Sequence, residues 1–241
     1  MADGIYAALS GAVAHYTSLE TTAQNLANID TTGYRAVTPV FHEVLAAEGN
    51  DRTVRFAAVR RSAVDLTPGA LRETGGSLDV AFGQSSFLAV ETPGGERYTR
   101  AGSLKIAPDG TLTTQRGHVV LGDDGGPIRV NTELGAQVSA QGEVSSGGKS
   151  VGFLRVVTFE DPGQMTYEGQ GLLQAMPEAG TARPSTDPVE VGKIEESNAS
   201  TVRAMTDLMA ASRMFDAMEQ AIGAFSQIDR RLVTTVPKFG G

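Results

Sequence analysis

Cysteine, tryptophan and histidine are scarce or missing in this sequence. Its 241 residues include no cysteine, no tryptophan and only three histidines. Without cysteine the chain can form no disulfide, no thiolate zinc site and no cysteine nucleophile. Long apolar runs are missing too, since no stretch approaches the ~18 uninterrupted apolar residues that a membrane-spanning helix needs. We therefore expect no direct membrane insertion.

The chain also has fewer positively charged than negatively charged residues. The chain has 20 Lys and Arg against 28 Asp and Glu, a net charge of −8, and it has no basic run that could follow a phosphate backbone. We therefore expect no nucleic-acid partner. With 40% apolar and 20% charged residues, the chain is expected to fold as one large domain or two small ones. Its first six residues lack the positive patch and apolar core of a secretory signal, so any export is expected to proceed without a cleaved signal peptide.

The residues that usually carry catalysis show no productive pattern. His15, His42 and His118 fall in three different expected elements, and none has a second ligand at metal-coordinating spacing. We interpret each histidine as structural or solvated. The sequence therefore predicts no catalytic residue, no cofactor and no metal site, and the protein is not expected to be an enzyme.

Two short motifs resemble chemical signatures, but each lacks an essential residue. Gly148-Lys149-Ser150 lacks the earlier glycine of a phosphate-binding loop, because Glu143 stands there. Gly83-Gln84-Ser85-Ser86-Phe87 lacks the second glycine of a nucleophile elbow. The acidic pairs Asp123-Asp124 and Glu195-Glu196 are expected to be solvated or to lie at a helix N-terminus rather than to catalyse a reaction.

Both ends of the chain show a helical pattern of apolar and small residues. In the first 30 residues they recur at alternating spacings of four and three, at Ile5, Leu9, Ala12, Tyr16, Leu19, Ala23 and Leu26. Near the other end, with Asp229 as the one polar break, they are Ala204, Leu208, Ala211, Phe215, Met218, Ile222, Phe225 and Leu232. Residues 28–33 are expected to end the first helix, and Asn198-Ala199-Ser200 to provide the N-cap of the second. Each stripe needs a partner, either the rest of a globular domain or another helix in a coiled coil.

Between about Leu71 and Leu173 short β-type runs replace the helical period. The runs are residues 78–82, 87–90, 97–100, 103–106, 111–114, 118–121, 128–130 and 153–159. Turns such as Pro108-Asp109-Gly110 and Gly147-Gly148 separate them and supply the positive φ of tight hairpins. The pattern predicts a mainly β central domain, an antiparallel sandwich or distorted barrel, with a single core face.

The predicted organisation is helix, linker, β domain, linker, helix. Residues 1–33 and 195–236 form the terminal helical domain, and residues 78–180 form the antiparallel β domain. Residues 34–77 and 181–194, which contain several prolines, are expected to be extended connections. Because the two helices bracket the β domain, they can meet only by folding back on each other or by pairing with neighbouring copies.

Several motifs occur together in an order that is specific to one family. Near the N-terminus they are Gly4–Ala12, Asn25-Leu26-Ala27-Asn28 and Thr31-Thr32-Gly33-Tyr34. In the middle they are residues 78–83, 98–104, 109–112, 117–122 and 126–128, and Glu195-Glu196-Ser197-Asn198 then opens the terminal helix. On these motifs the chain resembles the axial proteins of the bacterial flagellum, and most closely those of the proximal rod. It departs from the usual family pattern at Ser85-Ser86-Phe87 and at residues 212–215.

The resemblance implies a structural role in the rod of the flagellar basal body, in the periplasmic space. The terminal helices are expected to form a coiled-coil inner tube, with the β domain outside it. The implied partners are identical subunits, other rod proteins and the flagellar type III export apparatus. The subunit would polymerise helically and transmit torque across the periplasm. A distal-rod or hook-type subunit of the same family is the alternative.

Two other protein classes also have terminal helices or a β domain. A secreted hydrolase or adhesin would present a ligand-lined cleft, and the poor histidine inventory argues against the enzyme. A phage or secretion-system needle component would share the coiled-coil pattern, but it would lack the ordered Tyr98-Thr99-Arg100-Ala101-Gly102 block.

Overall fold

A computed structural model of the chain describes the backbone of residues 2–48 and 52–235, and the side chains of residues 10–41, 62–224 and 227. The chain divides into two compact units, which are described separately. The helical unit comprises residues 1–26, 38–62 and 201–241, and the β unit comprises residues 27–37 and 63–200. Neither helix in the described part of the chain has the length and apolar character needed to cross a lipid bilayer.

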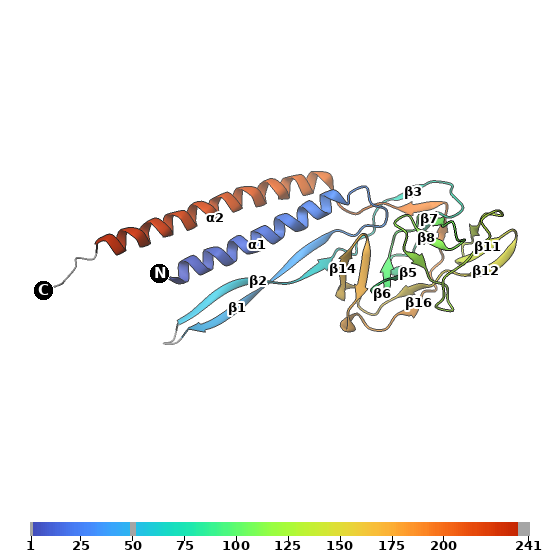
Figure 1. The fold of residues 1–241 in the computed structure, drawn as a ribbon, viewed down its shortest axis with the longest axis horizontal. Coiled ribbons are helices and arrows are strands. Elements are labelled where there is room, and N and C mark those ends of the chain that lie inside the picture. Colours follow the sequence, from blue (N-terminus) through green and yellow to red (C-terminus); the bar gives the residue numbers. More distant parts are fainter. Residues whose placement is uncertain (1, 49–51, 236–241) are drawn as a thin grey trace. The chain divides into compact units, whose positions relative to one another are not determined.

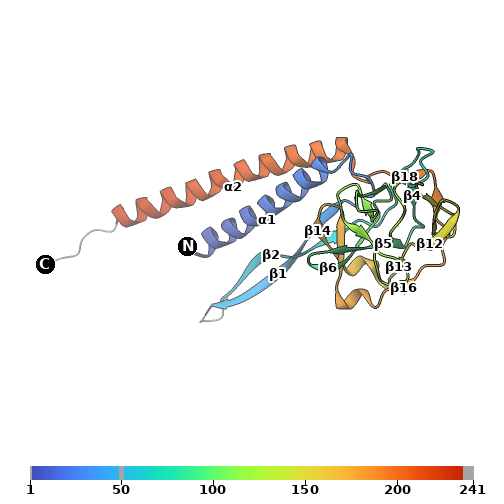
Figure 2. The same cartoon turned by 45° about the vertical axis from the view of Figure 1, so that its right-hand side comes forward.

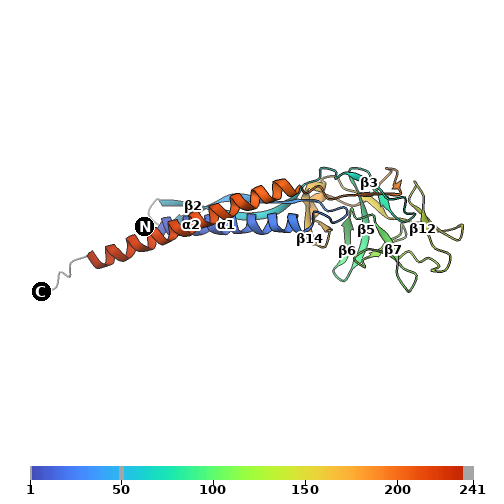
Figure 3. The same cartoon turned by 90° about the horizontal axis from the view of Figure 1, so that it is seen from above.

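The helical unit contains two long helices and most of a two-stranded sheet. The helices are α1 (Ala2–Ala27) and α2 (Thr201–Thr235), and the strands are β1 (Val37–Glu48) and β2 (Arg52–Val64). Figures 1 and 2 show α1 between α2 and the β1–β2 sheet, and Figure 3 shows the same elements from above, where α2 overlaps α1. Neither helix contains proline, so each backbone hydrogen-bond ladder can continue without a break. The two strands occupy a region that the sequence analysis assigns to an extended connection.

The end of α1 confirms the expected stop signal. The helix ends at Ala27, and a turn follows in which the Thr31 amide donates to the Asn28 carbonyl. Gly33 has φ +68°, and a Cβ there would lie 2.3 Å from the carbonyl carbon of Arg100. Only glycine combines this left-handed conformation with so close a backbone approach.

The start of α2 differs from the expectation. The helix begins at Thr201, whereas Glu195 belongs to strand β18 (Lys193–Glu195), which pairs with β3 (Leu71–Glu73). The prediction that Glu195-Glu196-Ser197-Asn198 opens the helix is therefore wrong. Two neighbouring glutamates give no strand signal by themselves, and the pairing with β3 depends on residues far away in the sequence.

The β unit contains one large antiparallel sheet and three small ones. The large sheet has nine strands, which run in the order β14-β15-β6-β5-β9-β8-β7, with β13 pairing with both β5 and β16. The path from β14 to β7 is open, so the sheet does not close into a barrel. The small sheets are β10-β11-β12, β17-β4 and β18-β3.

The other strands have the following bounds: β4 (Val80–Ala81), β5 (Ser86–Thr92), β6 (Gly95–Thr99), β7 (Leu104–Ile106), β8 (Leu112–Thr114), β9 (Val119–Val120), β10 (Gln137–Val138), β11 (Glu143–Ser146), β12 (Lys149–Phe153), β13 (Val156–Thr158), β14 (Met165–Gly169), β15 (Leu172–Ala175), β16 (Arg183–Pro184) and β17 (Glu190–Val191). Two short 3₁₀ helices lie at Pro162–Gln164 and Pro177–Ala179.

Two of the expected strands differ from the structure. Residues 128–130 form no strand and have only an isolated bridge at Arg129, and residues 153–159 divide between β12 and β13.

The core of the β unit lies on both faces of the central strand. In β5, Leu88 and Val90 belong to one apolar cluster, while Phe87 and Ala89 belong to another. Successive side chains of a strand point to opposite faces, so a strand buried on both faces shows no polar alternation. The expectation of a single core face is therefore wrong, although Val80 and Phe82 do lie in the first cluster.

Candidate functional site

The described seam residues of α1 are incompletely covered. Ala12, Leu19 and Leu26 are half-buried, and Ala23 is exposed. The Tyr16 side chain is 59% exposed, and its neighbour Val13 is similarly open. Ile5 and Leu9 lie in α1, but their side chains are outside the described residues. An apolar face this open leaves much of its surface in water.

The seam of α2 is covered in part. Ala204 and Ala211 are buried, Leu208, Met218 and Ile222 are half-buried, and Phe215 remains exposed. The side chains of Phe225 and Leu232 lie outside the described residues. A Cβ on Gly11 of α1 would lie 3.3 Å from Cε of Met218, so the two helices approach closely at this point. The missing side chain of Gly11 makes room for Met218.

A second apolar stripe on α2 was not identified from the sequence. Val202, Met205 and Met209 are 76%, 49% and 58% exposed. At 3.6 residues per turn they lie on the side of the helix away from Ala204 and Ala211. Apolar side chains gathered on one exposed face are typical of an interaction surface. In the sequence these three residues are spaced by three and four positions. The longer and more regular seam already accounted for a helix there, so this second stripe was not singled out.

The β unit contains a buried cluster of three charges. Glu195, Arg35 and Arg100 each have side chains that are only 2% exposed. Nη2 of Arg35 lies 2.6 Å from Oε1 of Glu195, and Nε of Arg100 donates to Oε2 at 2.6 Å. The amide of Gly69 donates a further hydrogen bond to Oε1 at 2.9 Å. Both carboxylate oxygens therefore have partners, which a buried carboxylate requires.

Arg100 is held by several groups besides Glu195. Its guanidinium donates to four backbone carbonyls, those of Phe82, Gly83, Gln84 and Ser86. It also lies over the ring of Phe87, with 5.8 Å between Cζ and the ring centroid. The strand and turn around residues 82–87 therefore determine where this side chain sits.

Arg35 has fewer partners. Its Nη1 donates to the carbonyl of Thr67, while its buried Nε has no hydrogen-bond partner among the described residues. The pKa of Arg35 is lowered to about 10, chiefly by burial and also by the nearby charge of Arg100, whereas Glu195 and Asp65 oppose this shift. Since the cluster holds two cations and one anion, Arg35 is the less compensated cation.

Asn198 joins the same part of the β unit. Its Oδ1 accepts a 2.6 Å hydrogen bond from the Ala36 amide, and its Nδ2 donates to the carbonyls of Asp65 and Thr67. The side chain is thus used for tertiary contacts three residues before α2 begins. Within the predicted N-cap segment Asn198-Ala199-Ser200, Ser200 directly precedes α2, while the Asn198 side chain makes these tertiary contacts. The prediction that Glu195 is solvated or lies at a helix N-terminus is wrong, because it is buried in β18.

Comparison with known sequences gives matches along most of the chain. Residues 5–35 match the family described as flagella basal body rod protein. Residues 83–146 match the flagellar hook protein FlgE/F/G D1 domain, and residues 190–235 match the flagellar basal body rod FlgEFG protein C-terminal family. These matches contain most of α1, all of α2, strands β5 to β11 and all three members of the charge cluster.

Individual proteins with similar sequences are also named as flagellar rod proteins. The flagellar basal-body rod protein FlgF of Mesorhizobium japonicum is 33% identical over 223 residues, 90% of each chain. The protein of the same name from Salmonella typhimurium is 32% identical over 246 residues, 96% of this chain and 97% of the relative. The chain belongs to the flagellar basal-body rod protein family. The rod protein is therefore a structural component of the basal body, and not an enzyme. A Bacillus subtilis relative named FlgG is 25% identical over 264 residues.

The motif residues of the rod protein lie at the junctions between elements. Asn25, Leu26 and Ala27 form the end of α1, and Asn28 begins the turn that follows. Thr32 and Gly33 continue this turn, and the Gly33 amide donates to the Glu195 carbonyl at 2.7 Å. After β18, the Ser197 hydroxyl accepts from the Ala199 amide. The motifs at the two ends of the chain are therefore bonded to each other within the β unit.

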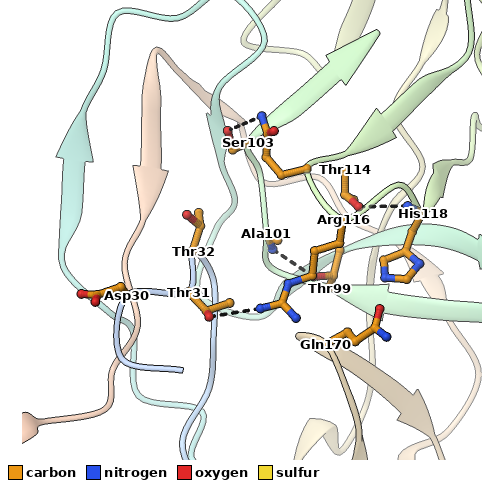
Figure 4. Close-up of a pocket in the computed structure, with 11 residues that line it drawn as sticks. Asp30, Thr31, Thr32, Thr99, Ala101, Ser103, Thr114, Arg116, His118 and Gln170 are labelled. Carbon is orange, nitrogen blue, oxygen red and sulfur yellow. Dashed lines mark hydrogen bonds between the residues drawn. The ribbon is translucent and has the colours of Figure 1, made fainter. Parts of the chain in front are cut away.

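A pocket of about 240 Å³, lined mostly by residues with polar or charged side chains, lies beside the same turn of the rod protein (Figure 4). Figure 4 shows Arg116 reaching toward Thr31, and the Arg116 Nη2 donates to the Thr31 hydroxyl at 3.2 Å. His118 and Gln170 line the opposite side. Burial lowers the pKa of His118, the charge of Arg116 lowers it further, and a hydrogen bond with Gln170 opposes both.

The three histidines of the rod protein belong to different parts of the chain. His15 lies on α1 and His118 lies beside β9, while the side chain of His42 is outside the described residues. Within the described part of the chain, no three acidic, histidine or cysteine side chains gather in a way that could hold a metal ion.

Proposed function

We propose that this rod protein polymerises helically through α1 and α2 and forms part of the proximal rod. The proposal rests on the apolar side chains that are exposed on both helices, above all Val202, Met209 and Tyr16. Covering them with helices of neighbouring subunits removes apolar surface from water, which favours association by roughly 25 cal/mol per Å². A head-to-tail contact that does not close into a ring continues as a helix, as a rod requires.

The coiled-coil inner tube belongs to the same proposal. The seam residues of both helices would contribute to it, with the close approach of Gly11 and Met218 as one intramolecular contact. In this arrangement α1 and α2, which lie within the terminal segments of residues 1–33 and 195–236, serve assembly, and the β domain of residues 78–180 forms the outer layer. A continuous stack of such subunits would transmit torque across the periplasm.

Substitution of an exposed residue tests the proposal without disturbing the core. We expect Met209→Glu to prevent incorporation into rods, because a charge would have to be buried in an apolar contact. The neighbouring Ala210 is also exposed but lies outside both apolar stripes, so Ala210→Glu is the matched control. Electron microscopy of basal bodies from a strain lacking the native chain provides the measurement. Complete rods with both variants would refute the proposal.

Cross-linking tests the position within the rod. The chain has no cysteine, so a single cysteine at residue 205 gives one defined attachment point. We expect cross-links to identical copies and to other proximal subunits. Cross-links only to distal-rod or hook subunits would support the alternative assignment.

Delivery by the flagellar type III export apparatus is part of the proposal. Isolated helices are marginally stable in water, so the terminal segments of a free subunit are expected to unfold readily and to pass through a narrow channel. Hydrogen exchange of the purified monomer measures this property. Fully protected amides throughout both terminal segments would contradict it.

A further inference from the structure

Three sequence motifs that are far apart in the chain meet at the buried charge cluster. Arg35 follows the Thr31–Tyr34 motif, Arg100 lies in the Tyr98–Gly102 motif, and Glu195 begins the motif before α2. The first and last of these are also joined through the backbone. The Gly33 amide donates to the Glu195 carbonyl at 2.7 Å, and the Asn198 amide donates to the Tyr34 carbonyl at 3.3 Å.

The two arginines have different roles in this cluster. Arg100 has four carbonyl acceptors from residues 82–86, so its position is determined even without Glu195. Arg35 forms its ion pair with Glu195, Asp65 contributes a weaker favourable charge, and Nη1 of Arg35 donates to the Thr67 carbonyl. Arg100 therefore fixes the position of the Glu195 carboxylate, and this carboxylate in turn fixes the position of the Arg35 guanidinium.

Stability alone does not account for such an arrangement. Removing charged groups from water costs several kcal/mol for each ion, and buried ion pairs often stabilise a fold no better than apolar side chains of similar size. In some proteins the directional contacts of such groups instead select one relative placement of the segments that they join. The segments joined here, residues 33–36 and 195–198, lie a few residues from the two helices: α1 ends at Ala27 and α2 begins at Thr201.

We propose that Arg35 and Glu195 are positioning residues for rod assembly, which hold the segment after α1 and the segment before α2 in one fixed arrangement. This inference rests on the proposed function, because the segments that the pair holds lead into the two helices that are proposed to assemble. Loss of the Arg35–Glu195 pair leaves the sheet of the β unit folded. It releases the segment at residues 33–36 and thereby prevents formation of complete rods.

Two variants of the full-length chain test the inference. Arg35→Met leaves the contact between Glu195 and Arg100 in place and removes only the less compensated cation. Glu195→Gln keeps the size of the side chain and removes its charge. Glu196→Gln is the matched control, because the adjacent Glu196 forms an exposed ion pair with Arg72 at 2.9 Å, with side chains 47% and 57% exposed.

Hydrogen exchange separates positioning from folding. With Arg35→Met we expect the protection of the Gly33 and Asn198 amides to fall by about tenfold or more, and with Glu195→Gln by about a hundredfold. The amides of Ala89 and Leu121, which donate to carbonyls within the β unit, should keep their protection. Loss of protection at Ala89 and Leu121 in both variants would overturn the inference, because the pair would then be a general part of the fold.

Rod formation supplies the second readout. We expect incomplete rods with Arg35→Met and Glu195→Gln, and complete rods with Glu196→Gln, in electron micrographs of basal bodies. Complete rods with both cluster variants would overturn the inference. If they occur while Met209→Glu still blocks incorporation, the positioning role is wrong and the assembly surface stands. If Met209→Glu also assembles normally, the proposed function fails as well.

Discussion

Replacing Arg100 with methionine is expected to destabilise the β unit strongly. Methionine has a similar length but no charge and no hydrogen-bond donor. The buried carbonyls of Phe82 and Ser86 would each lose a guanidinium donor, at 2.9 and 2.6 Å. An orphaned buried acceptor costs about 1–3 kcal/mol. Glu195 would keep Arg35 and the Gly69 amide as partners, so we expect a total loss of about 3–5 kcal/mol of unfolding free energy.

Thermal unfolding followed by circular dichroism measures this loss. For a unit of this size, 1 kcal/mol corresponds to about 2–4 °C in Tm, so we expect a decrease of about 10 °C. Arg72→Met is the control, since Arg72 and its partner Glu196 are half exposed and such pairs contribute at most about 1 kcal/mol. An equal decrease for Arg100→Met and Arg72→Met would refute the assigned role of the buried guanidinium.

Three further predictions concern single positions. Gly102→Ala should prevent folding of the β unit, because its Cβ would lie 1.7 Å from the Val80 carbonyl oxygen; a soluble variant with unchanged Tm would contradict this. Gly223→Ala should stabilise α2 by about 1 kcal/mol, seen as increased helical ellipticity, because alanine restricts the unfolded chain and no atom lies within 4 Å of the new Cβ; reduced ellipticity would contradict it. The pKa of His118 is lower in the folded protein than in the unfolded chain, so the wild type should lose stability as pH falls below about 6.5, where the unfolded state takes up more protons. His118→Asn should reduce this loss in Tm measured at pH 7.5 and 5.5, and an unchanged pH dependence would refute the contribution of His118.

The two helices were predictable because their signals are local. A spacing of three and four places side chains on one face of a helix whatever surrounds it, and residues 28–33 contain the chemistry that ends one. The structure accordingly has α1 ending at Ala27. The expected run 87–90 lies within the central strand β5, and β8 lies within the expected run 111–114. The family was recognisable because several motifs occur in a fixed order.

The short strands that pair over long distances were not predictable in the same way. β18 has three residues and pairs with β3, and β16 has two residues and pairs with β13. Strands this short carry too few residues for an alternating pattern. Whether such a segment forms a strand depends on its partner strand, and the neighbouring sequence gives no information on which strand that is.

Composition and local spacing determined that this protein has two terminal helices, a β-rich middle and no thiol chemistry. The tertiary structure decided which charges are buried. Glu195 and Glu196 are the same residue type side by side, yet Glu195 is 2% exposed and Glu196 is 47% exposed. Glu195 is the last residue of β18 and Glu196 lies beyond it, and only folding brings Arg35 and Arg100 to Glu195. A buried carboxylate requires these partners, and their positions are a property of the whole β unit.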